Sequence, residues 1–169
     1  MSLAERLAKW PRERLAERLS AACYGTVLVL VALPLIHPDD VSNGLGWELV
    51  TGVGLATWIA HLYAELVADR VHQSSHLVRE EVVTAMTDGA PILLAAVAPA
   101  LALGLGRLGA LDERVALWTA VGVAILQLVG VGAFVGSTVS RTGRRRWSYA
   151  AFTAAVGIAV VTLKLALGH

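Results

Sequence analysis

The chain has little charge and almost no cysteine. Only 16% of its 169 residues are charged and 56% are hydrophobic, whereas soluble domains carry roughly 25% charged and 45–50% apolar residues. A domain of about this length still exposes about 30% of its surface when folded. A soluble fold therefore has too little interior for the surplus apolar side chains, and we expect them to face lipid. The single cysteine, Cys23, excludes an internal disulfide and a multi-cysteine metal site.

Five long apolar runs follow one another along the chain. Each approaches the roughly 20 residues that a helix needs to cross a bilayer, and the sequence lacks the alternating segments of a membrane β-barrel. We therefore predict an all-α fold class: a polytopic membrane protein with a cytoplasmic segment 1–20 and a five-helix transmembrane domain 21–169. The predicted spans are about 21–36, 46–69, 89–108, 115–138 and 147–167.

Lysine and arginine are unevenly distributed between the connecting segments. Eleven of the fourteen lie before the first run or in the second and fourth loops. Because cytoplasmic loops are enriched in Lys and Arg, we predict a cytoplasmic N-terminus, an outside C-terminus and a bacterial-type plasma membrane. Segment 1–20 places Leu3, Leu7 and Trp10 on one helical face. It is predicted either to lie on the membrane surface or to be a charged tail that enforces topology.

Ionisable side chains cluster in and after the second run, in the stretch WIAHLYAELVADRVHQSSH. At membrane depth such groups cost roughly 2.5–3.5 kcal/mol each and are functional candidates by default. At about 100° per residue, the histidines and acids of this stretch fall within an arc of about 80°. Further acids precede the third run. The candidate metal- or proton-binding residues are His61, Glu65, Asp69, His72, His76, Glu80 and Asp88.

The spacing of His61 and Glu65 gives this stripe its chemistry. Side chains four residues apart on a helix are neighbours, and an imidazole beside a carboxylate suits a divalent Fe, Mn or Zn ion. The pair equally suits a proton relay, because imidazole titrates near neutrality. A structural hydrogen bond between helices is the alternative for this pair. Asp69 can instead pair with a nearby arginine, and His72 and His76 can simply be solvated.

Proline and small residues predict how the other runs pack. The sequence Asp88-Gly89-Ala90-Pro91 predicts a helix break or cap that turns Asp88 inward, and prolines in the first and third runs predict kinks. In the fourth run Gly132 and Gly136 have GxxxG spacing, with Gln127 deeper in the membrane. They predict either a homodimer seam or tight packing within one subunit.

The remaining motifs are few. Arg144, Arg145 and Arg146 suit anionic lipid headgroups, although orienting the fifth run is sufficient reason for them. The sequence has no HExxH, GxxxxGK[ST] or Gly-x-Ser-x-Gly motif and no nucleic-acid-binding layout. We therefore predict a protein that is not an enzyme and that binds lipid rather than nucleic acid.

Two stretches resemble the vacuolar iron transporter family: YAELVADRVHQSS in the second run, and GVGAFVGSTVSRTGRRRW followed by a fifth run of small residues. The resemblance implies five transmembrane helices, a cytosolic N-terminus and an acidic connection between the second and third helices. It also implies that Glu65 matches the family's glutamate in helix two, and that His61 stands where the family has a methionine.

These observations predict a membrane transporter or binding protein for a divalent metal cation, coupled to protons, that forms a homodimer. His61 and Glu65 are the predicted ligands in mid-membrane, and the other acids and histidines of the stripe form a cytoplasmic vestibule. Two alternatives remain open. One is a proton or ion channel whose pore the same stripe lines, and the other is a structural or accessory subunit whose stripe docks a partner helix.

Overall fold

Every element that the computed structural model describes is helical. It describes residues 12–72, 79–139 and 143–167, and the all-α prediction is confirmed for them. The elements are α2 (Arg12–Ala32), the 3-10 turn η1 (Leu33–Leu35), α3 (Pro38–Asn43), α4 (Leu45–His72), α5 (Arg79–Arg107), α6 (Glu113–Val139) and α7 (Gly143–Leu167).

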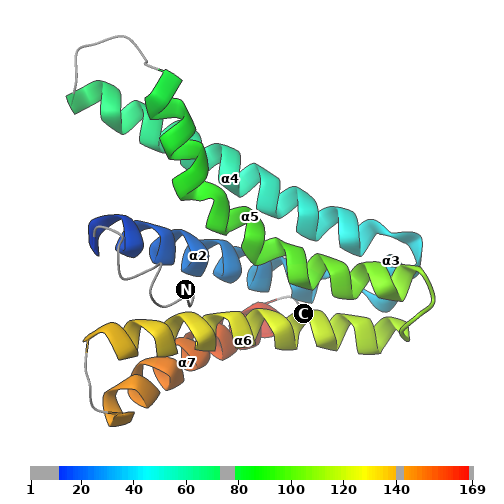
Figure 1. The fold of residues 1–169 in the computed structure, drawn as a ribbon. Helices are drawn as coiled ribbons and strands as arrows, with labels where there is room; N and C mark the ends of the chain where they lie inside the picture. The colour runs from blue at the N-terminus through cyan, green and yellow to red at the C-terminus, as the bar shows by residue number, and fades with distance from the viewer. Residues whose placement is uncertain (1–11, 73–78, 140–142, 168–169) are drawn as a thin grey trace.

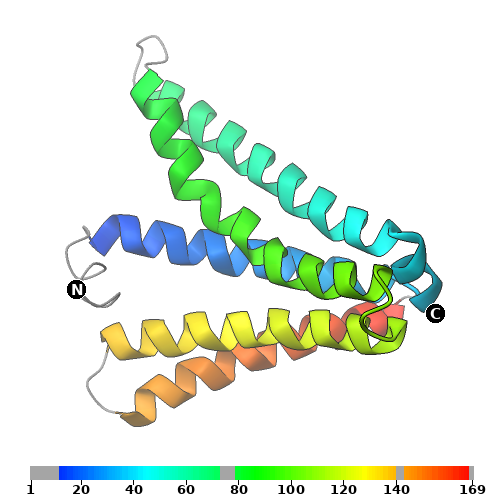
Figure 2. The same cartoon turned by 45° about the vertical axis from the view of Figure 1, so that its right-hand side comes forward.

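The long helices alternate in direction (Figure 1). One end of the bundle carries α3, the turn from α5 to α6 and the end of α7; we call it the α3 end. The opposite end carries the start of α2, the end of α4 and the start of α5. Figure 2 shows that α4 and the first part of α5 lean away from α2 and α6 there. We call this diverging pair the α4–α5 tip.

Among the described residues, four helices are long and apolar enough to cross a membrane: Arg14–Leu35, Leu45–Ala68, Val82–Arg107 and Glu113–Ser137. In α7 the apolar stretch Trp147–Leu163 is shorter. The helices thus support an integral membrane protein. A fifth span and the orientation of the two termini stay predictions.

Two predicted boundaries differ from the structure. Helix α2 begins at Arg12, so the predicted boundary at residue 20 falls inside a helix, because RERLAERLSAA is composed mainly of helix-forming residues. Helix α5 begins at Arg79 and continues through Gly89 and Pro91, so the predicted break there is wrong. A proline inside a helix removes one hydrogen bond and can bend the helix without ending it. Figure 2 shows α5 changing direction along its length.

The first loop contains a short helix that its sequence did not reveal. Helix α3 starts with Pro38 at its first position, where proline's fixed φ and missing N–H are favourable. The backbone N–H of His37 donates to the Asp40 carboxylate over 2.8 Å. Gly44 ends the helix at φ +84°, a conformation that side chains disfavour. These contacts bring α4 back beside α2 and α5.

The core lies between α2, α5 and α6. Its largest buried side chains include Leu30, Leu33, Ile92 and Leu103, and alanines of α6 complete it. Helix α4 contributes less, because it packs chiefly on α5. Only 17% of its apolar window is buried, against 50% for α5. Most of α4 is therefore available to lipid or to another helix.

Gly132 joins α6 to α7 within one chain. A Cβ at this buried position would lie 2.8 Å from the Tyr149 carbonyl oxygen and would also meet the Thr153 hydroxyl. The neighbouring glycine of the motif, Gly136, is buried as well. At Gly132 the small residue thus serves close packing inside one subunit, which was one of the two predicted roles. Gln127 has a buried Oε1 with no hydrogen-bond partner among the described residues.

We expect Gly132→Ala to destabilise the protein by about 1–2 kcal/mol, because the new methyl group overpacks the α6–α7 contact. Gly130→Ala is the matched control, since a Cβ there meets no described atom within 4 Å. Thermal unfolding in detergent measures both. Equal stability of the two variants would contradict the close α6–α7 approach.

Candidate functional site

His61 and Glu65 form an ion pair or hydrogen bond inside the apolar span of α4. Their Nε2 and Oε1 atoms are 3.0 Å apart, and the two side chains are 30% and 33% exposed. The spacing of four residues brings them together on consecutive turns, as the helical register predicts. Partial burial makes the interaction stronger than the same contact in water.

The face of α4 that carries this pair packs on α5. A Cβ on Gly54 would meet Ala96 Cβ at 2.7 Å. Gly89 lies on α5, two turns before Ala96. A Cβ added to Gly89 would lie 3.2 Å from Trp58 Cδ1 and 3.3 Å from His61 Cδ2. The indole N–H of Trp58 donates to a carbonyl of α5 over 3.4 Å. The missing side chain at Gly89 therefore lets the imidazole lie directly against α5.

A second ionic contact lies one residue away on α5. Arg18 Nε of α2 donates to Asp88 Oδ1 over 2.9 Å, and Asp88 is buried. Successive helical residues point about 100° apart, so Gly89 faces α4 while Asp88 faces α2. The turn of α5 at these two residues thus lies between two polar pairs, one from each neighbouring helix.

Arg18 is the residue of this region that sequence reasoning missed. It was counted only among the basic residues that set orientation. The sequence feature that could have indicated its role is its position inside the first apolar span, Arg14–Leu35. A charged group at membrane depth requires a partner. Asp88 is buried, as its predicted inward orientation requires, and it accepts the hydrogen bond from Arg18. Its place in a cytoplasmic vestibule stays a prediction.

The other predicted site residues are less well defined. Asp69 and His72 belong to α4 and Glu80 belongs to α5, but their side chains lie outside the described part of the structure, and His76 lies outside the described residues altogether. Within the described ranges no group of three or more His, Cys, Asp or Glu side chains could hold a metal ion. The described donors are thus one imidazole and one carboxylate.

Arg144, Arg145 and Arg146 fall in the first turn of α7, and their side chains are likewise not described.

An imidazole and a carboxylate in contact are, in general, a donor set for either a proton or a cation. With a proton present, an imidazolium and a carboxylate neutralise each other, which lowers the cost of burying either charge. Without the proton, the imidazole nitrogen and the carboxylate oxygens become donors to a borderline divalent metal. The two states carry different charge at the same place.

Compared with protein-family models, with curated proteins and with solved structures, the chain gives no significant match. The resemblance to the vacuolar iron transporter family stays a prediction.

Proposed function

We propose that the protein carries a divalent metal cation across a membrane in exchange for protons, with His61 and Glu65 as the exchange site. The observation that carries the proposal is the 3.0 Å contact between their Nε2 and Oε1 atoms inside an apolar span, on the helix face that meets α5. Ionisable groups at membrane depth are costly and mark ion or proton pathways.

The mechanism rests on competition. A proton and a divalent cation require the same lone pairs of imidazole and carboxylate, so binding of one releases the other. The cation is the substrate, an ion of Fe, Mn or Zn by the donor set. Asp69, one turn beyond Glu65 in α4, is the next acid on the route toward the α4–α5 tip. The proposal includes five spans, a cytoplasmic N-terminus, a bacterial-type plasma membrane and a homodimer.

The first test is metal-dependent thermal stabilisation of the purified protein. We expect Fe²⁺, Mn²⁺ or Zn²⁺ at about 100-fold excess over its Kd to raise Tm by about 5 °C or more. Glu65→Gln should abolish the shift, because an amide is a poor metal ligand and does not release a proton.

Glu48→Gln is the matched control. Glu48 is an exposed acid in the first turn of the same helix, so this variant should keep the full shift. If no ion stabilises the wild type more than Glu65→Gln, the metal site is excluded. In liposomes a carrier gives saturable, pH-coupled uptake, whereas the channel alternative gives conductance without saturation.

The exposure of α4 favours one other function. With only 17% of its apolar window buried, α4 has a wide surface for a partner helix, as an accessory subunit requires. This alternative expects no flux from the isolated protein, and it expects His61→Ala and Glu65→Ala to abolish complex formation. Flux from the purified wild type that Glu65→Gln removes would reject it.

A further inference from the structure

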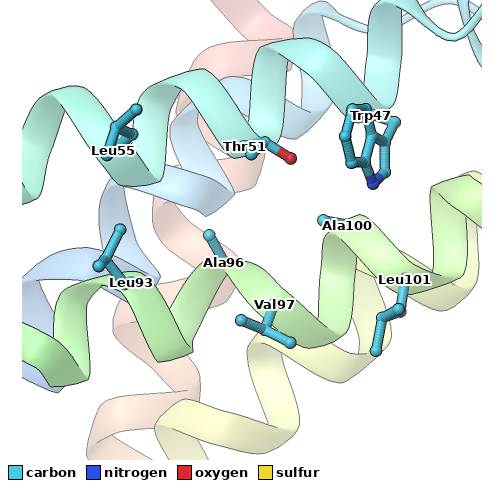
Figure 3. Close-up of a pocket in the computed structure, with 8 residues that line it drawn as sticks. All are labelled: Trp47, Thr51, Leu55, Leu93, Ala96, Val97, Ala100 and Leu101. Carbon is cyan, nitrogen blue, oxygen red and sulfur yellow. The ribbon is translucent and has the colours of Figure 1, made fainter.

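An apolar groove runs between α4 and α5 in the half of the bundle nearer the α3 end (Figure 3). It encloses about 340 Å³. Along α4 it extends from Trp47 to Leu55, which corresponds to about 12 Å of helix. The groove lies away from the His61–Glu65 pair, further along the same contact between the two helices. Its walls are formed by Trp47, Thr51, Leu55, Leu93, Val97 and Leu101.

Small residues of α5 form the floor of this groove. Ala96 and Ala100 lie four residues apart, and Gly104 follows one turn later. A Cβ added to Gly104 would lie 3.5 Å from Trp47 Cδ1. Larger side chains stand on either side, and Val97 and Leu101 are 48% and 62% exposed. The groove therefore opens sideways, toward the bilayer.

Of the described residues that line the groove, Trp47 and Thr51 are the two with a polar side-chain atom, and they lie one turn apart at one end. Figure 3 shows the Trp47 indole nitrogen directed toward α5. Neither the Trp47 indole N–H nor the Thr51 hydroxyl has a hydrogen-bond partner in the described structure. By contrast, four other threonines, Thr26, Thr87, Thr153 and Thr162, donate to the carbonyl one turn before them.

A cation lies just beyond these two donors. The Arg107 guanidinium packs over Gly44, where a Cβ would come within 2.7 Å of Cζ. Gly44 precedes Trp47 by about one turn, and Arg107 follows Gly104 by about one turn, so the guanidinium stands at the same end of the α4–α5 contact. Arg107 is exposed and forms no ion pair among residues 12–72, 79–139 and 143–167.

We propose that this groove binds one phospholipid of the leaflet at the α3 end. Its phosphate contacts Arg107, its ester carbonyl accepts hydrogen bonds from Trp47 and Thr51, and one acyl chain lies between Leu55 and Val97. The order of groups matches the lipid: a cation, then two donors, then an apolar channel. An arginine pairs well with phosphate oxygens, and aromatic side chains with a polar tip belong at the membrane interface.

A second helix fits this site less well. A helix with its side chains is about 10–12 Å across, whereas the groove lies between two helices that touch at Gly54 and Ala96. An apolar helix would also leave Arg107 without an anion. The inference requires that α4 and α5 lie in a bilayer, and it does not depend on cation transport.

Photo-crosslinking tests the site. The full-length protein is reconstituted in phosphatidylcholine vesicles that contain a minor fraction of phosphatidylglycerol with a diazirine on one acyl chain. After irradiation, labelled residues are mapped by peptide mass spectrometry. We expect labelling concentrated on α4 and α5 around Leu55 and Val97. Val97→Trp, which fills the groove, and Arg107→Gln, which removes the cation, should each lower it about fivefold.

Two controls match these variants. Leu94→Trp adds the same bulk at an exposed α5 position that does not line the groove, and Arg114→Gln removes an exposed arginine at the same end of the bundle. Both should leave the labelling unchanged. Labelling spread evenly over all exposed helices, or lowered equally by the controls, would overturn the proposal. A groove that takes no lipid label, in a protein that migrates as a dimer in native electrophoresis, would point to a second chain in place of the lipid.

Discussion

Gly25→Leu is expected to destabilise the protein by about 3 kcal/mol, because it forces α2 away from α5. A Cβ at Gly25 would lie 2.8 Å from Ile92 Cα and 3.0 Å from Ile92 O. These are backbone atoms, so no rotamer change relieves the contact, and the rest of a leucine side chain has no space. Gly25 and Ile92 are both buried in the centre of the bundle. The separation of α2 from α5 would therefore expose the largest apolar contact that α2 makes.

The unfolding midpoint in detergent, measured by tryptophan fluorescence, gives the size of this effect. Gly122→Leu is the matched control on α6, because its Cβ would meet no described atom within 4 Å. Leucine has the higher helix propensity, by roughly 0.8 kcal/mol relative to glycine, so the control should be as stable as the wild type or slightly more stable. If both variants lose the same stability, the tight contact between Gly25 and Ile92 does not explain the loss in Gly25→Leu.

Composition predicts the helices, and periodicity predicts which side chains share the face of α4 that meets α5. Both features of the sequence are local. The surplus of apolar side chains predicts membrane spans, and four helices fulfil that expectation by length and hydropathy. Helical register predicts that Gly54, Trp58, His61 and Glu65 share one face. In the structure the first three of these pack on α5, and the last two contact each other. The shared face and the His61–Glu65 contact each involve only a few turns of α4.

Long-range partners could not be predicted in the same way. Arg18 and Asp88 are separated by 70 positions, and nothing in either local sequence names the other. The helix α3 was missed because a proline and two acids are typical of a loop as well as of a helix start. Helix α5 continues through Pro91 because its other contacts outweigh one lost hydrogen bond. In all three cases the outcome depends on contacts between segments that lie far apart in the sequence.

The Arg18–Asp88 pair allows a prediction about both stability and the candidate site. Asp88→Ala leaves Arg18, which lies in the apolar helix Arg14–Leu35, without this carboxylate. Removal of one partner of a fully buried pair costs roughly 3–5 kcal/mol. Because the Arg18 side chain is 30% exposed, water reaches it in part, and we expect a loss of about 2–3 kcal/mol.

An apolar double variant separates the effect of the charge pair from that of its surroundings. Arg18→Met with Asp88→Leu replaces both charges by apolar side chains and should recover most of the stability that Asp88→Ala loses, since an apolar pair can replace a buried ion pair. Asp39→Ala, at an exposed position in α3, is the control and should cost less than about 0.5 kcal/mol. A double variant as unstable as Asp88→Ala would show that packing, and not the charge pair, holds this turn.

The same variants also report on the proposed cation site, because Asp88 and Gly89 share one turn of α5. If the contact with Arg18 fixes that turn, then Gly89 is held against Trp58 and His61. A shift of α5 in Asp88→Ala would change the surface that supports the imidazole. We therefore expect Asp88→Ala to weaken the metal-dependent rise in Tm, and the apolar double variant to restore it together with the stability. Full metal response in Asp88→Ala would mean that the two polar pairs on either side of α5 act independently.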